Sequence, residues 1–377
     1  YVADGTIAGA VFLAASGDKI LACEAVGQAD IASQKPMRED SIFWIASMSK
    51  PVAGTALMML VDEGKISLDD PVSKYIPEFA APQKIVPMDA GQLFSVTNLT
   101  GAPPDAGAAQ EAGAQTASRP ARQRDITVRH VLSHTSGLRF SAPDEKPTFD
   151  LLPLAKCVAL YAATDLLFEP GTDYSYSNAG TNTVGRVVEI VSEMPYETFL
   201  QTRIFDPLGM RDTTFWPNEE QLPRVATSYR GDLPKRTLTP QPVHQLRYPL
   251  NDRANRHPFP GGGLFSTAGD VARLGQLLLN KGLFNGKRLL GETAVAEMTR
   301  RQTPSGKPDY GLCLLRQPGK FGHGGAYTTE FMIHPGESLV TVFMTQKIGD
   351  WGGPDGDKII PAFEQQAREL ARQRAAK

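Results

Sequence analysis

Residues 45–51 read Ile-Ala-Ser-Met-Ser-Lys-Pro and directly precede a run, residues 52–63, that favours a helix. Apolar or small residues recur in this run at 52, 53, 56, 57, 60 and 61, which share one helical face, and Gly64 supplies a typical helix end. We therefore expect Ser47 at the entrance to a buried helix, with Lys50 one turn later. Because a helix N-terminus favours negative charge, Ser47 and Lys50 form a candidate nucleophile and base.

The same spacing also has a plainer interpretation, in which Ser47 only caps the helix and Lys50 is solvated. A second match, Ser16-Gly17-Asp18-Lys19, lies between apolar runs at residues 7–15 and 19–26. There the pattern predicts only a hairpin turn. The rest of the chain must therefore supply the partners that a serine nucleophile needs.

The composition is that of an ordinary globular protein, with 41% hydrophobic and 21% charged residues in a chain of 377. This length predicts one large two-lobed domain or two domains. The net charge of −2 gives no indication of a nucleic acid or an anionic membrane as a partner. The three cysteines and six histidines show no metal-ligand spacing, so we expect no metal and no other cofactor.

No apolar run of about 18 residues occurs, so no transmembrane helix is expected. The sequence begins at Tyr1 rather than at a methionine. The location of the protein therefore stays open: periplasmic or secreted if a signal peptide has been removed, and otherwise cytoplasmic. The oligomeric state is open as well.

Strand patterns lie at the two ends of the chain, and helical patterns lie between them. The expected strands are residues 7–15, 19–26, 310–316, 328–334 and 339–345. The expected helices are 52–63, 126–132 (capped by Thr127), 150–167, 179–200, 268–280, 290–300 and 357–375. An insertion is expected at 81–124, with short strands within 85–96 and low-complexity sequence after them, and 216–258 is expected to be mostly irregular.

These patterns predict an α/β (α+β) fold, with an antiparallel sheet built from the N- and C-terminal segments, flanked by helices, and an inserted, mostly helical lobe. Residues 1–80 and 260–377 would form the sheet domain, which carries the Ser47 helix and the strand of His323. Residues 81–259 would form the helical lobe, which carries Tyr176 and includes the insertion at 81–124.

A second proton-handling group is offered by the stretch Tyr174-Ser175-Tyr176-Ser177-Asn178, which follows a Glu-Pro-Gly turn and precedes a helix. A tyrosine beside a lysine could be held as a phenolate or could shuttle a proton, because an ammonium group favours the charged form. The alternative is that the aromatic residue only packs.

A Gly-rich stretch, Phe321-Gly322-His323-Gly324-Gly325-Ala326, is expected just before a strand. Glycines let the backbone approach a ligand closely, and a strand edge offers N–H groups to an oxyanion. The alternative is a turn with an exposed histidine. Lys347-Ile348-Gly349 is a rival pattern, for which we expect a role at the end of the final strand.

Two other serine arrangements carry less weight. Ser133 and His134 are neighbours in sequence, and neighbours rarely form a working dyad. No Gly-x-Ser-x-Gly motif occurs, which argues against an α/β-hydrolase nucleophile.

Taken in order, Ser47-x-x-Lys50, Tyr176-x-Asn178 and His323-Gly324-Gly325 resemble the motifs of the serine β-lactamase and penicillin-binding-protein fold. Within that fold, the chain looks most similar to class C β-lactamases, the DD-peptidases of that branch and the family VIII carboxylesterases. Supporting stretches are residues 132–138, 207–210 and 262–267, and the resemblance covers nearly the whole chain apart from 81–124.

The resemblance implies a role for each matching position. Ser47 would be the acylated nucleophile, and Lys50 and Tyr176 would form the general-base network. Asn178 would orient the substrate or the lysine, and His323, Gly324 and Gly325 would contact the substrate. The backbone N–H groups of Ser47 and Ala326 would form the oxyanion hole.

One position departs from the lactamase pattern, because His323 stands where the resemblance places the lysine of Lys-Thr-Gly. A neutral histidine holds a substrate carboxylate less firmly than a lysine does. The leading hypothesis is therefore a serine carboxylesterase for short acyl or aryl esters, with weak β-lactamase activity possible. A class C-like β-lactamase or D-amino-acid peptidase is the alternative, and a non-catalytic protein that traps an acyl group is a third. The expected ligand is a small-molecule ester or β-lactam.

Overall fold

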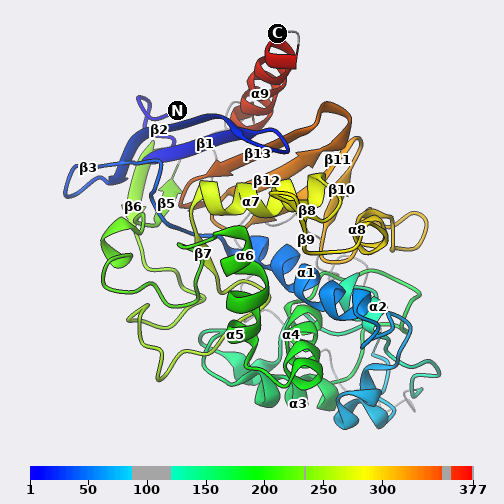
Figure 1. Cartoon of the computed structure of the whole chain (residues 1–377). Helices are drawn as coiled ribbons and strands as arrows, with labels where there is room; N and C mark the ends of the chain where they lie inside the picture. Colours follow the sequence, from blue (N-terminus) through cyan, green and yellow to red (C-terminus); the bar gives the residue numbers. More distant parts are fainter. Residues whose placement is uncertain (87–119, 233–234, 350–357, 376–377) are drawn as a thin grey trace.

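The main element of the fold is a large antiparallel sheet that joins the two ends of the chain (Figure 1). The computed structural model describes residues 1–86, 120–232, 235–349 and 358–375. In these residues the strand order is β10-β11-β12-β13-β1-β2-β3, with β1 paired to β13 in antiparallel register. The predicted antiparallel sheet is confirmed. Its strands are β1 (Gly9–Ala15), β2 (Ile20–Asp30), β3 (Lys35–Pro36), β10 (Leu315–Gln317), β11 (Lys320–Gly325), β12 (Thr329–His334) and β13 (Leu339–Met344).

Helices cover both faces of this sheet. Helix α7 (Ala268–Leu279) packs on one face and α9 (Ile359–Ala375) on the other (Figure 1). The alternation of side chains along β1 explains this, because Val11 and Leu13 enter the main core while Ala10 faces α9. The sheet is therefore the middle layer of three.

A helical lobe lies on the α7 side, and α1 (Ser49–Asp62) runs between this lobe and the sheet (Figure 1). Every residue of α1 from Ser49 to Leu60 is buried, whereas the apolar period predicted a single buried face. The helix is buried all round because it has neighbours on each side. The other helices are α2 (Val128–Leu132), α3 (Leu154–Ala163), α4 (Asn178–Ser192), α5 (Tyr196–Leu200), α6 (Asp206–Leu208) and α8 (Glu292–Thr299), with a π-turn at Gln201–Phe205.

Short strands and 3-10 turns complete the described part of the chain. The strands are β4 (Phe43–Trp44) with β7 (Phe265–Ser266), β8 (Leu283–Phe284) with β9 (Lys287–Arg288), and a sheet of β14 (Lys347–Gly349), β5 (Tyr229–Asp232) and β6 (Thr237–Pro240). The 3-10 turns are η1 (Ala46–Met48), η2 (Val72–Lys74), η3 (Pro77–Ala80), η6 (Pro143–Glu145), η8 (Leu222–Arg224) and η9 (Pro335–Glu337).

Several predicted elements have different bounds in the structure. The helix predicted at 179–200 is two helices, because Glu193 adopts a left-handed conformation and Pro195 cannot continue the first. The helix predicted at 150–167 extends only over α3, and only residue 315 onward forms the strand predicted at 310–316. The cap of the helix at 126–132 by Thr127 is confirmed.

Two further expectations are corrected. The Gly-rich stretch predicted to precede a strand is itself a strand, β11, and Lys347–Gly349 forms β14, which pairs in parallel with β5. The described part of 216–258 is mostly irregular, as predicted, apart from the strands β5 and β6. Within the insertion, Lys84 and Ile85 form isolated bridges, and the rest of the expectation for 87–119 lies outside the described residues.

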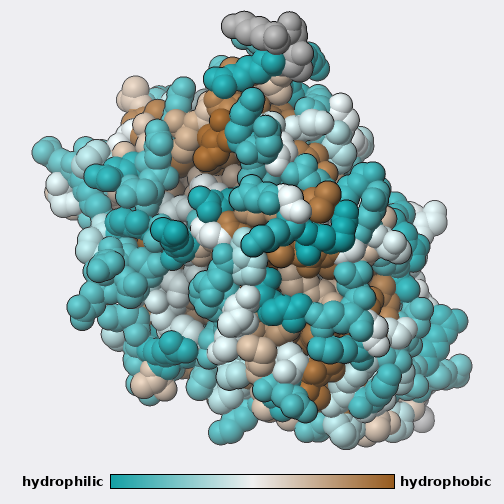
Figure 2. Space-filling view, in the orientation of Figure 1, coloured by the Kyte–Doolittle hydropathy of each residue, from teal (hydrophilic) through white to brown (hydrophobic). Residues whose placement is uncertain are grey.

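The surface in view is dominated by hydrophilic residues, with hydrophobic residues in separate patches (Figure 2). No helix in the described ranges combines the length and the apolar character that crossing a membrane requires.

A buried ion pair anchors the irregular segment that precedes Gly261. The carboxylate of Asp150, which is 1% exposed, accepts hydrogen bonds from Arg256 Nε at 2.7 Å and from the Arg247 backbone N–H at 2.9 Å. Arg256 also donates to the carbonyls of Phe215, at 3.0 Å, and Leu250. The pair therefore links the segment around residue 150 to the segment at 247–256.

We expect Asp150→Ala to lower the free energy of unfolding by about 3–5 kcal/mol, because it leaves a buried guanidinium without its counter-charge. Urea denaturation followed by circular dichroism measures the change. The matched control is Asp40→Ala, which breaks a pair with the exposed Arg38 and should change stability little. Equal losses in the two variants would contradict the role assigned to Asp150.

Candidate active site

Ser47 lies in the 3-10 turn η1, immediately before α1. The preceding residue, Ala46, has a φ of +46°, a left-handed conformation that is uncommon for residues other than glycine. Ser49 holds this turn, because its hydroxyl donates to the Ala46 carbonyl at 2.7 Å and accepts from the Leu264 N–H at 3.2 Å. The predicted position of Ser47 at a helix entrance is therefore the observed one.

Lys50 is fully buried and its amine meets three acceptors. The Nζ atom lies 3.2 Å from Ser47 Oγ, 2.7 Å from Asn178 Oδ1 and 2.5 Å from the Gly261 carbonyl oxygen. Burial lowers the pKa of Lys50 from its ordinary value of 10.5 to about 7. A substantial share of the lysine is therefore a free amine near neutral pH, which is the form that can accept a proton from Ser47.

Tyr176 lies directly before the N-cap of α4, and its ring packs beside the lysine. Lys50 Nζ is 4.6 Å from the ring centroid. Burial raises the pKa of Tyr176 well above its usual range, and a hydrogen bond with Ser47 acts in the opposite direction. Burial therefore favours a neutral phenol over the phenolate that the sequence left open.

Asn178 is the first residue of α4 and orients the lysine directly. Its Oδ1 accepts the hydrogen bond from Lys50, and Ser177 caps the helix by accepting from the Gly180 N–H. A Cβ at Gly261 would lie 2.9 Å from Asn178 Oδ1, so only glycine brings its carbonyl this close to the lysine. Gly261 was not among the predicted site residues.

His323 lies on β11 and is fully buried, with both ring nitrogens bonded inside the protein. Nδ1 donates to the Gly324 carbonyl at 2.7 Å, which assigns the proton to that nitrogen, and Nε2 accepts from the Tyr310 hydroxyl at 2.9 Å. Burial, with the nearby Lys50, lowers the pKa of His323 to about 3. The imidazole is therefore neutral and enclosed by the protein.

The end of β11 approaches the Ser47 turn closely. A Cβ at Gly325 would lie 2.5 Å from the Ile45 carbonyl, and Thr329 Oγ1 donates to the same carbonyl at 3.3 Å. Ala326 begins the turn that joins β11 to β12, and it is partly exposed, as are Gly324 and Gly325. This places the predicted substrate-facing glycines and Ala326 on the strand end beside the nucleophile.

His134, which the sequence offered only as a neighbour of Ser133 and which was set aside there, packs against Tyr176. Its carbonyl accepts from the Ser175 N–H at 3.0 Å and its Nδ1 accepts from the Ser177 N–H at 3.2 Å, so it binds the residue on each side of Tyr176. The two rings are 4.6 Å apart. Burial lowers the pKa of His134 well below its usual range, so the ring is neutral. The left-handed φ of +60° at His134 lets both contacts form.

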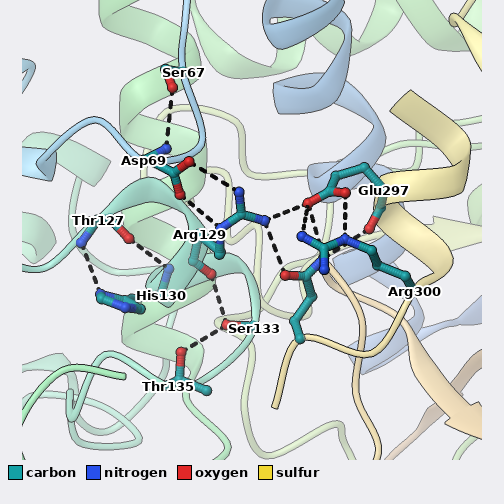
Figure 3. A network of polar contacts seen from close by, with 10 residues as sticks. Ser67, Asp69, Thr127, Arg129, His130, Ser133, Thr135, Glu297 and Arg300 are labelled. Atoms are coloured by element: carbon teal, nitrogen blue, oxygen red, sulfur yellow. Dashed lines mark hydrogen bonds and ion pairs between the residues drawn. The ribbon is translucent and has the colours of Figure 1, made fainter. Parts of the chain in front are cut away.

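A charged network anchors the turn that carries His134. Figure 3 shows Arg129 between Asp69 and Glu297, with Arg300 also bonded to Glu297. The Ser133 hydroxyl contacts the Arg129 carbonyl and the Thr135 hydroxyl, each at 2.8 Å. Helix α2 is thus fixed to the loop after α1 and to α8.

No group of three or more His, Cys, Asp or Glu side chains suited to a metal ion occurs in the part of the chain that the structure describes. Cys23, Cys157 and Cys313 are free thiols.

Comparisons with known proteins find relatives that cover most of the chain. The family model named Beta-lactamase matches residues 1–359. Protein Rv1367c of Mycobacterium tuberculosis is 30% identical over 380 residues, covering 92% of this chain and 87% of that protein. Penicillin-binding protein 4 of Amycolatopsis lactamdurans is 28% identical, covering 88% of this chain and 78% of that protein. Esterase EstB of Burkholderia gladioli is 27% identical, covering 71% of this chain and 64% of that protein.

A solved structure shares the fold. EstCE1, described as a hydrolase with promiscuous acyltransferase activity, superposes with a TM-score of 0.73 at 24% identity, covering 98% of this chain and 95% of that chain.

Proposed function

The chain belongs to the beta-lactamase family, and we propose that it is a serine carboxylesterase that hydrolyses short-chain acyl or aryl esters through an acyl-enzyme at Ser47. The observation that carries this proposal is the buried amine of Lys50, which lies within hydrogen-bond distance of Asn178, the Gly261 carbonyl and the Ser47 hydroxyl. The ligand we propose is a small-molecule ester.

We also propose that the chain divides into a sheet domain (1–80 and 260–377) and a helical lobe (81–259).

In the first half of the reaction, the Lys50 amine takes the Ser47 proton while Oγ attacks the ester carbonyl carbon. The backbone N–H groups of Ser47 and Ala326 stabilise the negative oxygen of the tetrahedral intermediate. When the intermediate collapses, the bond to the alcohol breaks, and the alcohol leaves with a proton that passes from Lys50 through Tyr176.

In the second half, water attacks the acyl carbon and passes a proton to the same pair of side chains. The bond to Oγ then breaks, the carboxylic acid leaves, and Ser47 recovers its proton. Each turnover consumes one ester and one water and releases one alcohol and one acid.

The neutral state of His323 supports an ester over a substrate with a carboxylate. Both ring nitrogens are occupied and the ring carries no charge near neutral pH, so it offers no cationic partner to an anionic substrate. Similarity to esterase EstB points in the same direction.

Aromatic rings beside Tyr176 support apolar or aryl groups on the substrate. Phe140 is partly exposed and its ring centroid lies 6.3 Å from that of Tyr176. Phe149, also partly exposed, lies 6.1 Å from Phe140 and 5.2 Å from Phe259. Such rings favour contact with flat or aliphatic groups.

A class C-like β-lactamase or a D-amino-acid peptidase is the second candidate, because penicillin-binding protein 4 is similar over 88% of the chain. A non-catalytic protein that only traps an acyl group is a third and weaker candidate, since Ser47, Lys50 and Tyr176 are all present and adjacent.

One parallel assay separates these candidates. The purified protein is given p-nitrophenyl acetate, butyrate and octanoate, nitrocefin, and a peptide ending in D-Ala-D-Ala, with intact-mass measurement after each addition. We expect the short esters to have the highest kcat/KM. Faster turnover of nitrocefin or of the peptide would favour the second candidate, and a persistent acyl adduct without turnover would favour the third.

A further inference from the structure

We propose that Asn182 is a positioning residue that aims the Gly261 carbonyl at the catalytic lysine. This inference rests on the proposed role of Lys50 as the base. Asn182 lies on α4, one turn after Asn178, so the two asparagines share a helical face. Asn178 contacts the lysine directly, and Asn182 acts through Gly261.

The contact runs through one residue of the loop that precedes β7. The Gly261 N–H donates to Asn182 Oδ1 at 3.1 Å, and the Gly261 carbonyl accepts from Lys50 Nζ at 2.5 Å. Neighbouring contacts hold the rest of this loop: Trp44 Nε1 donates to the Gly262 carbonyl at 2.7 Å, and Ser49 binds the Leu264 N–H. Asn182 is therefore the side chain that holds the N–H of Gly261, the residue whose carbonyl meets the lysine. The peptide that follows is held by the backbone, because the Gly262 N–H donates to the Phe259 carbonyl at 3.0 Å.

The far side of Asn182 is fixed as well. Its Nδ2 donates to the Tyr161 hydroxyl at 2.9 Å, and that hydroxyl donates to the Glu145 carboxylate. Glu145 also accepts from the Ala142 N–H at 2.6 Å. Because the Gly261 N–H can only donate, Oδ1 must face it, and the orientation of the amide is set from both ends.

This chain of hydrogen bonds is buried and runs in one direction, from Gly261 through Asn182 and Tyr161 to Glu145. Asn182, Tyr161 and Glu145 are 1%, 1% and 2% exposed. A buried polar network whose members are all paired is rigid, and its donors strengthen one another. Packed hydrophobic side chains would fill the same space without the cost of desolvation, so we infer that the network is retained for the geometry it imposes.

Asn182→Leu, which keeps the size and removes both contacts, is expected to lower kcat/KM by about 100-fold, mostly through kcat, because a displaced carbonyl lets the amine move away from Ser47. The acidic limb of the pH–rate profile should move to lower pH, because the lysine ammonium loses an acceptor that stabilises it. Both are measured with p-nitrophenyl butyrate. The matched control is Thr183→Val, the next buried residue of α4, whose hydroxyl bonds only the Ala179 carbonyl of its own helix, at 2.8 Å.

A second variant guards against a failure of Asn182→Leu to fold. Tyr161→Phe keeps the ring but removes the hydroxyl that links Asn182 to Glu145. We expect a smaller decrease in kcat/KM than in Asn182→Leu and a smaller shift of the acidic limb of the pH–rate profile. A purely structural role would reduce the folded fraction and the melting temperature without moving the acidic limb. If Asn182→Leu folds and both its kcat and the acidic limb of its pH–rate profile match those of the wild type, the inference is overturned.

The substrate panel keeps this outcome separate from the proposed function. If the wild-type protein prefers nitrocefin or the peptide, the same variants are compared on that substrate, and the positioning role is judged there. If the variants match the wild type while Ser47 is essential, the inference fails and the proposed function stands.

Discussion

Ser47→Ala is expected to abolish ester turnover, with kcat falling about 10⁴–10⁶-fold, as is found when the nucleophile of a serine hydrolase is removed. The physical reason is that the Ser47 hydroxyl, 3.2 Å from the Lys50 amine, is the group that would attack the ester carbonyl. Turnover of p-nitrophenyl butyrate measures the loss. Intact-mass measurement should also show that the acyl adduct seen with a slow substrate on the wild-type protein is absent from the variant.

The chain supplies its own control for this variant. Ser16 and Lys19 repeat the Ser-x-x-Lys spacing, but Ser16 lies at the turn between β1 and β2 and its hydroxyl contacts Asp18 at 2.6 Å. Ser16→Ala should leave turnover unchanged. Undiminished hydrolysis in Ser47→Ala would refute the assignment of the nucleophile, whatever the fold of the protein.

The contrast between these two serines shows what sequence patterns can predict. The hairpin of β1 and β2 and the helix after Ser47 follow from local periodicity, and both were predicted. The pairing of β1 with β13 joins the two ends of the chain and has no local signal of its own. The placement of strands at both ends predicted one sheet that joins the two segments, but not this particular pairing.

Strand β11 illustrates a local signal that misleads. Glycine has a low preference for strands, so Gly322, Gly324 and Gly325 obscure the strand in the sequence. In the structure, β10 and β12 flank this stretch, and a Cβ at Gly322 would lie 2.1 Å from the Phe331 carbonyl. Close approach of the neighbouring strand requires the glycine and makes the segment look like a turn.

The contacts of the candidate site also fall into those that sequence patterns indicate and those that they do not. Ser47 and Lys50 were paired by their spacing, and Tyr176 and Asn178 by the order of motifs along the chain. The bond between Lys50 and Gly261 spans 211 residues, and that between Asn182 and Gly261 spans 79. Neither could be read from one sequence, because nothing local marks which loop carbonyl a buried amine will meet.

These long-range contacts give α4 a particular place in the chemistry. Its first turn carries Asn178, which binds the lysine, and its second carries Asn182, which binds Gly261, the loop residue whose carbonyl also meets the amine. Tyr176 directly precedes the N-cap, Ser177. One helix therefore positions the lysine through two contacts, one direct and one through Gly261, and also carries the tyrosine at its start, so small shifts of α4 should affect kcat more than KM.

Lys50→Met is expected to lower kcat about 10²–10⁴-fold, the range for loss of a general base, because the amine that accepts the Ser47 proton is removed while the length of the side chain is kept. In the wild type, kcat/KM should rise with pH, with a slope of about one in logarithmic units below pH 7, and level off above it, because the pKa of Lys50 is about 7 and only the free amine is a base. This rise should be absent from the residual activity of Lys50→Met.

A second substitution separates the basicity of Lys50 from its charge. Lys50→Arg keeps a cation beside Asn178 and Gly261, but a guanidinium group stays protonated at any pH the protein tolerates and cannot accept the proton. We therefore expect Lys50→Arg to be as slow as Lys50→Met, with melting temperatures confirming that both are folded. If Lys50→Arg kept the activity and pH profile of the wild type, Lys50 would act through its positive charge, and the proton of Ser47 would have to pass to Tyr176 instead. Burial holds Tyr176 as a neutral phenol, which is why we expect the opposite result.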